Sequence, residues 1–478
     1  MISWNEYLII CTLGIVIGAS IIGWRKVLQI YNYPLAFFLV MYMTYVVRPY
    51  VSYTVGSGLY VFDLLLPGIS YMVAKDKLDL ALVFCPAVIS FGIGYRLIHN
   101  RYSYSARVEV ASQNNPNQVN AIYLWASIGF VILGYSSFLI ARRGFLGFGG
   151  GPIELIATKS GTTLGNTTGY VELANYLIIT GVLLYYASTR KLNWSILLAA
   201  PWIANQVYYG WARFMLIVLG FGLMGVWLVH RRNYRIPVKH GIFVMPVAIA
   251  SIILLILMRS DREFARKGKS IDSLVEGVQS TTIDNALGDF SGFEGTWFMI
   301  STMNYRTPLY GSSIIYNLFI KPIPRIIWKG KILLRDFTWS DILNNDSYES
   351  YLYTTLGKSE DLWYQGPVRG SIGYALEEWG WVGLAINFII TGLFLGWIQT
   401  RVLVADQDNP AWIAAYAATY GLIGLLGRND LFSVLTYHVL LFYIPYALIN
   451  YLAKRYPLGY PSRRQPPVTG ISLHQKPQ

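Results

Sequence analysis

The sequence predicts an all-α polytopic membrane protein, because the chain is apolar, carries little charge and contains many long hydrophobic runs. Of its 478 residues, 54% are hydrophobic and 13% are charged, whereas an average soluble domain has about 25% charged residues. The apolar runs approach the ~20 residues with which a helix crosses a bilayer. The 15 Trp and 37 Tyr suit aromatic belts at the two membrane interfaces, although a carbohydrate-binding surface would raise the same count.

The apolar runs indicate about twelve spans, arranged around a long polar segment in the second half of the chain. Residues 59–73 are the least regular of them, because Asp63 and Pro67 interrupt the run, and a re-entrant or interfacial placement is the alternative there. The first run is followed by the Arg25-Lys26 pair and has no basic region before it, which favours a retained span over a cleaved signal. The expected spans are 7–23, 34–47, 59–73, 78–98, 121–140, 170–187, 194–209, 214–229, 241–258, 381–398, 411–426 and 431–452.

Clusters of Lys and Arg orient the spans, since short loops that carry them stay on the cytoplasmic side of the membrane. Such clusters lie at 96–107, at 230–240 and after Lys454. Counting spans from these clusters places two loops, 142–169 and 259–372, on the outer side. We expect the larger loop to be structured and partly helical.

The orientation of the N-terminus depends on residues 59–73. If this run crosses the membrane, the N-terminus is inside and the Arg25-Lys26 pair is outside; if it does not cross, both reverse. Twelve spans with an inside N-terminus is the favoured expectation. Residues 1–456 then form a single membrane domain, and the tail 457–478, rich in Pro, Arg and Gln, is expected to be a disordered cytoplasmic extension.

The composition argues against several other classes of protein. The net charge is +13, but membrane orientation and anionic lipid headgroups account for the short basic clusters, so nucleic acid is not an expected partner. Cys11 and Cys85 lie in apolar runs and predict no disulfide framework. The five His residues are scattered, and the outer residues contain no Asp-x-Asp or His-x-x-x-His spacing. We therefore expect no metal and no cofactor.

Three arginines form the sharpest candidate site. Arg259, Arg262 and Arg266 follow an expected span directly, and their spacing puts all three on one face if the helix continues outward. Guanidinium groups bind phosphate oxygens in pairs and stay charged at any working pH, so this face suits a diphosphate at the level of the lipid headgroups. The alternative is a solvated helix on which the arginines pair with Asp261 and Glu263.

Two further arginines lie at the outer ends of expected spans. Arg213 begins one span, and an ionisable residue in that position is a candidate for substrate binding. The alternative is an interfacial anchor beside Trp211. Arg428 lies between two late spans, where a local pair with Asp430 in a tight turn is the alternative to a role in the site.

The large loop contributes both cations and carboxylates. Its arginines Arg325 and Arg369 are expected to add to the diphosphate site, and its Trp and Tyr residues offer faces for sugar rings. Among the carboxylates of the loop and of the membrane edge that follows it, Glu294, Glu377 and Glu378 are the candidates for a general base that takes a proton from a sugar hydroxyl. Most carboxylates of the loop must be solvated or paired with basic residues instead. Glu377 and Glu378 are favoured because burial at the start of a span would raise their basicity.

Two segments resemble the O-antigen and exopolysaccharide polymerase family. The segment 322–331 reads Pro-Ile-Pro-Arg-Ile-Ile-Trp-Lys-Gly-Lys and is similar to the family's Pro-Arg…Trp…Lys pattern. The segment 370–383 contains Gly-Ser-x-Gly followed by Trp-Gly-Trp-Val-Gly and looks like the family's return from loop to helix. The overall layout, with many spans and one long late outer loop, is similar as well. The family's carboxylate before an aromatic-glycine pair does not align securely with Glu377 and Glu378, so the choice of base stays open.

The resemblance implies a GT-C-like, metal-independent glycosyltransferase in the bacterial cytoplasmic (inner) membrane, with its active site on the periplasmic face. The enzyme would join undecaprenyl-diphosphate-linked oligosaccharide repeat units, moving the growing glycan onto a hydroxyl of a new unit. The implied partners are polyprenyl-diphosphate-linked oligosaccharides, membrane lipids and a chain-length regulator protein. The arginines would hold the diphosphate, and a carboxylate would take the acceptor proton.

Two other functions remain open. A ligase on the same scaffold would attach a finished glycan to lipid A core or protein, and the lack of His in the large loop favours the polymerase over it. A flippase or transporter for lipid-linked sugars would show paired repeats and a polar cavity shared by two halves, neither of which is evident in the sequence.

Overall fold

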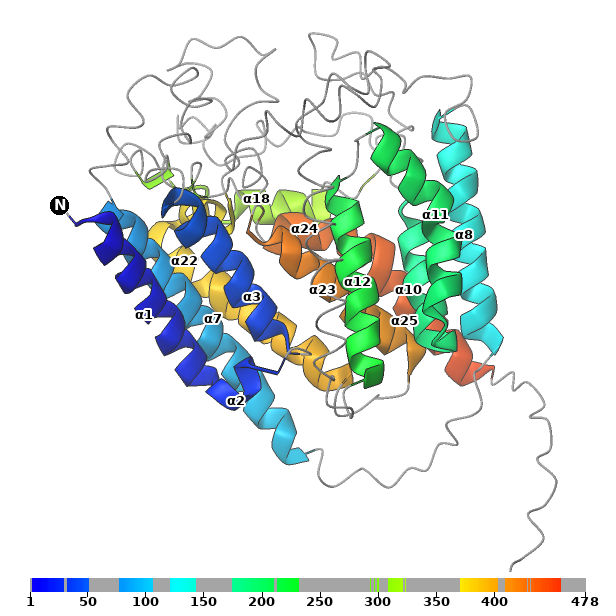
Figure 1. Cartoon of the computed structure of the whole chain (residues 1–478), viewed down its shortest axis with the longest axis horizontal. Helices are drawn as coiled ribbons and strands as arrows, with labels where there is room; N and C mark the ends of the chain where they lie inside the picture. Colours follow the sequence, from blue (N-terminus) through cyan, green and yellow to red (C-terminus); the bar gives the residue numbers. More distant parts are fainter. Residues whose placement is uncertain are drawn as a thin grey trace, which may run out of the picture.

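The computed structural model describes residues 2–29, 32–50, 77–105, 121–142, 174–209, 213–231, 308–320, 370–402, 409–427 and 431–456, with isolated positions at 293, 296, 299–300, 323 and 429. Every element in this part of the chain is helical, and the helices form a bundle (Figure 1). The elements are α1 (Trp4–Ile22), α2 (Trp24–Val27), α3 (Tyr33–Tyr42), η1 (Met43–Val47), α7 (Lys77–Ser105), α8 (Ala121–Arg142), α10 (Leu177–Thr189), α11 (Leu192–Tyr209), α12 (Arg213–Arg231), α18 (Ser312–Ile315), η5 (Tyr316–Ile320), α22 (Gly370–Thr400), α23 (Pro410–Leu425), α24 (Leu431–His438), η8 (Val439–Tyr443) and α25 (Ile444–Arg455).

The described helices have the length and composition of a membrane protein. Among them, 5 are long and apolar enough to cross a membrane, and three shorter apolar helices accompany them. This agrees with the predicted all-α membrane class. The expected spans 59–73 and 241–258 and most of the outer loop 259–372 lie outside the described residues. The five helices are Trp4–Ile22, Lys77–Ile98, Ala121–Leu139, Gly370–Thr400 and Val434–Arg455.

One side of the bundle is built on close helix contacts at glycine. A Cβ on Gly94 of α7 would lie 2.2 Å from the carbonyl oxygen of Ile389 in α22, and one on Gly92 would lie 2.7 Å from that of Gly18 in α1. Small residues let membrane helices approach closely and gain van der Waals contact where no hydrophobic force drives them together. Helices α1, α7 and α22 therefore pack as a tight layer (Figure 1).

The other side consists of α8, α10, α11, α12, α23 and α25, and glycine sets its closest contacts too. Gly181 of α10 packs against Ser127 of α8, where a Cβ would lie 2.5 Å from the carbonyl oxygen. On Gly421 of α23, a Cβ would lie 2.6 Å from the Cα atom of Val218 in α12. These contacts place α10 and α23 at the centre of this side.

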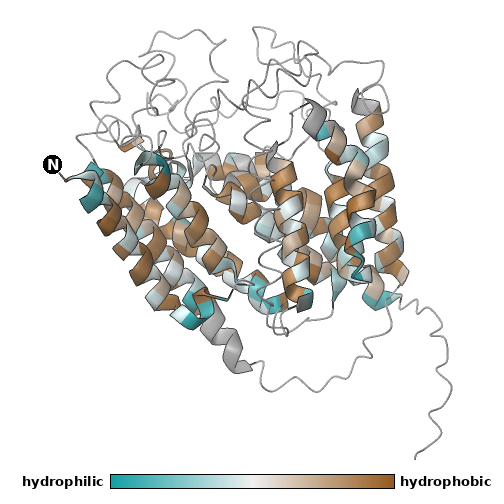
Figure 2. Ribbon diagram, viewed as in Figure 1, coloured by the Kyte–Doolittle hydropathy of each residue, from teal (hydrophilic) through white to brown (hydrophobic). Residues whose placement is uncertain are grey.

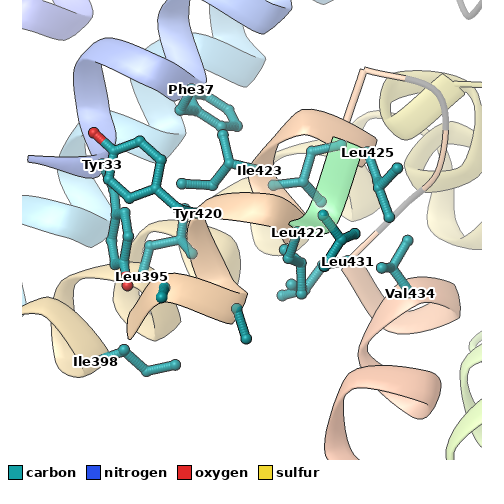
Figure 3. Packing of buried hydrophobic residues seen from close by; sticks show 14 of the residues in the cluster. Tyr33, Phe37, Leu395, Ile398, Tyr420, Leu422, Ile423, Leu425, Leu431 and Val434 are labelled. Atoms are coloured by element: carbon teal, nitrogen blue, oxygen red, sulfur yellow. The ribbon is translucent and has the colours of Figure 1, made fainter. Parts of the chain in front are cut away.

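Helix α3 connects the two sides through aromatic and amide side chains. The ring of Tyr33 stacks on Tyr416 of α23 with centroids 4.7 Å apart, and its hydroxyl donates to the Tyr416 carbonyl oxygen at 2.9 Å. Apolar side chains continue the contact on both flanks, as Figure 3 shows for Phe37 and Ile423. The core therefore runs across the bundle without a break at α3.

Helices α1 and α7 run in the same direction. Lys77, at the start of α7, donates to the carbonyl oxygen of Ile2 at 3.1 Å. Arg96, towards the other end, donates to that of Ile21 at 2.9 Å. The N-terminus of the chain therefore lies at the end of the bundle opposite Arg96.

This direction corrects the expected topology of the N-terminal third. Helix α3 returns towards the start of α1, since the Tyr50 hydroxyl lies 3.4 Å from the side-chain oxygen of Asn5. The described chain thus stops at Tyr50 and resumes at Lys77 at one and the same end of the bundle. Twelve spans with an inside N-terminus required α1 and α7 to run in opposite directions, and the hydrogen bonds of Lys77 and Arg96 show them parallel instead. The expected span 59–73 itself lies outside the described residues, so whether it crosses the membrane stays a prediction.

Charged residues are divided unequally between the two ends of the bundle. Figure 2 shows apolar helix centres between more polar ends. We call one end the basic end, because the charged side chains described there are all cations. The opposite end, which we call the acidic end, has Glu6, Asp79, Glu377 and Glu378 together with Arg48 and Lys77. The basic end carries Arg25, Lys26, Arg96, Arg190, Lys191, Arg401, Lys454 and Arg455.

Candidate functional site

Two glutamates lie buried at the acidic end. Glu377 and Glu378 are 6% and 4% exposed, in the first part of α22. In the sequence-based prediction the outer loop ends at residue 372 and the span begins at 381, with both carboxylates at the membrane edge. The structure corrects this, because α22 already begins at Gly370 and carries both residues inside the bundle. Carboxylates buried in a membrane bundle are costly to maintain, and they mark candidate functional sites.

Helix α22 is interrupted directly after these glutamates. Trp379 has φ −144° and ψ 27°, and Gly380 has φ 60° and ψ −139°, so neither is helical. In a regular helix the carbonyls of residues 377 and 378 would accept from the N–H groups four residues later. Here the N–H groups of Leu309 and Tyr310 donate to them instead, at 2.9 and 2.8 Å. A distant part of the chain therefore supplies the hydrogen-bond donors for the two carbonyls at the interruption.

The segment that supplies these N–H groups is a tight turn. Tyr310 and Gly311 both have positive φ, at 50° and 84°. Gly311 lies against the indole of Trp379, where a Cβ would come within 2.9 Å of the ring. The turn leads into α18 and η5, which lie across the acidic end above α24 (Figure 1).

The start of α22 is held by two side-chain oxygens. The first N–H groups of a helix have no partner within it. In α22 the N–H of Ile372 donates to the hydroxyl of Tyr45 at 3.3 Å, and that of Gly373 to Oγ1 of Thr296 at 3.1 Å. Thr296 in turn donates to the Tyr45 hydroxyl at 3.4 Å. The carboxylate-bearing segment 370–378 is therefore fixed at both of its ends.

Arg48 is a buried cation at the same end. It is 6% exposed and lies in the helical continuation of η1, three residues after Tyr45. Arg48 is not among the site residues predicted from the sequence. The available signal was an arginine that follows the apolar run 34–47 directly and precedes Pro49. A buried arginine beside an apolar run is as informative there as Arg213 is at the start of its own span.

The structure places one of the expected diphosphate-binding arginines and the neighbours of two others. Arg213 is the first residue of α12, at the acidic end. Gly370, which follows Arg369, begins α22, and Gly427, which precedes Arg428, packs against Thr44 of η1. The remaining expected site residues lie outside the described part of the chain, so their roles stay predictions. They are Arg259, Arg262, Arg266, Arg325, Arg369, Arg428 and Glu294.

Histidine and cysteine are not gathered at this site. His438, at the end of α24, is 1% exposed, and its Nδ1 lies 3.3 Å from the carbonyl oxygen of Val434. Cys11 and Cys85 are free thiols on α1 and α7. Within the described ranges no three His, Cys, Asp or Glu residues are grouped so that they could hold a metal ion. The described polar side chains at the acidic end include carboxylates, hydroxyls, the Arg48 guanidinium group and the Lys77 ammonium group.

Comparison with known proteins adds no relative: no family model, no curated protein and no solved structure matches this chain.

Proposed function

We propose that the protein is a membrane glycosyltransferase that joins polyprenyl-diphosphate-linked oligosaccharide repeat units at the outer face of a bacterial cytoplasmic membrane. One observation carries the proposal. Two glutamates, Glu377 and Glu378, are buried in the bundle on the segment 370–378 of the interrupted helix α22. Other parts of the chain bind both ends of this segment. A positioned carboxylate of this kind suits a general base.

The reaction needs a base and a group that accepts negative charge. An oxygen of the acceptor sugar forms a bond to the anomeric carbon of the donor glycan, and its proton passes to a carboxylate. The bond from that carbon to the diphosphate oxygen breaks, and the polyprenyl diphosphate leaves with the electron pair. Glu377 or Glu378 is proposed to take the proton. Arg213 and the arginines of the outer loop are proposed to stabilise the diphosphate.

The charge distribution supports the proposed side of action. Cytoplasmic ends of membrane helices carry an excess of Lys and Arg, and the basic end of this bundle fits that rule. The acidic end is then the outer one, where the lipid-linked units of this class of reaction are presented. Arg48 and Lys77 are the cations with described side chains there.

A transporter is the main alternative from another class, because transporters also use interrupted helices. In such proteins the unwound carbonyls and half-helix ends bind the ion or substrate. In α22 the interruption at Trp379 and Gly380 frees the backbone carbonyls of the two glutamates. The N–H groups of Leu309 and Tyr310 already donate to these carbonyls. This favours a rigid frame for the glutamates over a cation site made of backbone.

The proposal is tested by reconstitution. The purified protein in lipid nanodiscs is given lipid-linked oligosaccharide units, and products are separated on a gel. A ladder of lengths supports a polymerase, a single transfer to another acceptor lipid supports a ligase, and no new glycosidic bond overturns the proposal. The same assay with a chelator is expected to keep its ladder, since arginines rather than a cation are proposed to neutralise the diphosphate.

Substitution of the glutamates tests their role directly. Glu377→Gln or Glu378→Gln is expected to lower the rate roughly 100-fold or more, the usual effect of losing a general base. Asp79→Asn is the matched control, because Asp79 is an exposed acid at the same end of the bundle. Normal ladders from both glutamine variants would remove the carboxylates from the mechanism.

A further inference from the structure

Tyr45 connects four separate parts of the chain at the acidic end. Its side chain is completely buried. Its hydroxyl accepts from Ile372 of α22 and from Thr296, and its ring lies 6.1 Å from that of Phe84 in α7. Its carbonyl oxygen accepts a hydrogen bond from the hydroxyl of Tyr7 in α1.

The place of Tyr45 in its own helix is also unusual. It is the middle residue of η1, a π-helical turn of 5 residues that continues α3. A π turn closes each hydrogen bond over one residue more than an α-helix does, and such turns occur frequently at functional sites. The extra residue rotates the following side chains by about 100° around the helix axis. The turn thereby sets the faces on which Tyr45 and Arg48 lie.

The hydroxyl of Tyr45 acts on the same segment that carries the glutamates. Ile372 is near the start of the segment 370–378, and Glu377 lies five residues later, about one and a half helical turns away. The other end of the segment is held by Leu309 and Tyr310. A rigid helical turn between two fixed ends transmits a change at one end to the side chains between them.

We propose that Tyr45 is a positioning residue of the proposed glycosyl transfer: its hydroxyl fixes the start of α22 and so sets where Glu377 and Glu378 stand. This inference rests on the proposed function, because it concerns the rate of that reaction. Tyr45 does not touch the reacting atoms. Its contribution is geometric, and a misplacement of about 1 Å in a catalytic group can lower a rate 100-fold.

The test uses two tyrosine variants on the same helix. Tyr45→Phe keeps the ring and removes the hydroxyl that accepts from Ile372. Tyr33→Phe is the matched control, since Tyr33 is equally buried and its hydroxyl bonds to the Tyr416 backbone at the opposite end of α3. Both variants are assayed in nanodiscs for kcat and KM, and amide hydrogen exchange is followed across 370–378.

A positioning role predicts a specific pattern. Tyr45→Phe is expected to lower kcat roughly 10- to 100-fold while KM for the acceptor stays within about twofold, and to speed amide exchange in 370–378. Tyr33→Phe is expected to leave kcat and this exchange unchanged. If Tyr45→Phe does not fold, Thr296→Val removes the neighbouring acceptor of the Gly373 N–H and is expected to change kcat in the same direction.

The possible failures are distinguishable. A wild-type protein that forms no glycosidic bond overturns the proposed function, and the positioning role in that reaction with it. An active wild type with a normal kcat in Tyr45→Phe overturns the inference alone. Equal losses of kcat in Tyr45→Phe and Tyr33→Phe would also overturn it, because they would indicate a general effect on the bundle.

Discussion

The backbone N–H of Tyr33 donates a 2.9 Å hydrogen bond to the side-chain oxygen of Gln399, which joins the first turn of α3 to the last turn of α22. The amide of Gln399 also donates to the side-chain oxygen of Asn32. At its other end α3 leads into Tyr45, which binds the start of α22 at Ile372. Helix α3 and its continuation η1 therefore run antiparallel to α22, with hydrogen bonds to α22 near both ends of that helix.

Removing the Gln399 amide is expected to destabilise the bundle at its basic end. Gln399→Leu leaves the Tyr33 N–H and the buried Asn32 side chain without this partner, and an unsatisfied buried polar group costs about 1–3 kcal/mol. Thermal unfolding of the purified variant in detergent is expected to show a lower Tm. Thr400→Val is the control, because the Thr400 hydroxyl donates within its own helix, to the Gly396 carbonyl at 2.7 Å. Equal Tm values for both variants would contradict the prediction.

The different surroundings of Gly94 and Gly220 predict opposite effects when each is replaced by alanine. Gly94→Ala places a Cβ 2.2 Å from the Ile389 backbone oxygen, and pushing the helices apart is expected to cost about 1–3 kcal/mol. Gly220 of α12 has open space at the same position, so Gly220→Ala is expected to stabilise its helix by up to about 1 kcal/mol. Unfolding in detergent measures both. A stable Gly94→Ala protein would mean that the two helices are not in contact as described.

The direction of α1 predicts which residues are reached from outside the cell. In a background with Cys11→Ala and Cys85→Ala, a cysteine at Ser3, beside Glu6, reports on the acidic end, and one at Gln29, beside Lys26, reports on the basic end. A membrane-impermeant maleimide is expected to label Ser3→Cys in intact cells and Gln29→Cys only after permeabilisation, because the basic end is proposed to be the cytoplasmic one. The reverse pattern would place Glu377 and Glu378 on the cytoplasmic face and remove the proposed outer site.

Local signals in the sequence were sufficient to predict most of the described helices. The expected span 411–426 corresponds to α23, whose start follows from Asn409, which caps the helix, and from Pro410 at its first position. The expected span 78–98 lies within α7, despite the internal Pro86. In both cases apolar length and the residues at the ends carry the information, and neither depends on the rest of the chain.

Non-local contacts explain what the sequence did not reveal. The start of α22 at Gly370 depends on Tyr45 and Thr296, and Tyr45 is 327 residues away from Ile372 in the chain. Hydropathy has no signal for such a cap, so the prediction began the span only at 381. The parallel direction of α1 and α7 was missed for the same reason, because it is set by contacts such as that of Lys77 with Ile2. Glu377 and Glu378 could be selected from their place at the start of an expected span, but the contacts that hold their segment inside the bundle could not be predicted.

The interruption of α22 predicts a strong effect of a small substitution at Gly380. Its φ of 60° and ψ of −139° belong to a region that only glycine adopts readily, and another residue held there costs about 1–3 kcal/mol. Gly380→Ala is therefore expected to lower Tm and to drive the helix towards regular geometry. Regular geometry would return the Glu377 and Glu378 carbonyls to their own helix and release the N–H groups of Leu309 and Tyr310. Faster amide exchange at these two residues, with loss of glycosyl transfer, is the expected result.

Gly129→Ala in α8, where a Cβ meets open space, is the control and should change neither. Wild-type exchange at Leu309 and Tyr310 in Gly380→Ala would show that the glutamates do not depend on the interruption for their position.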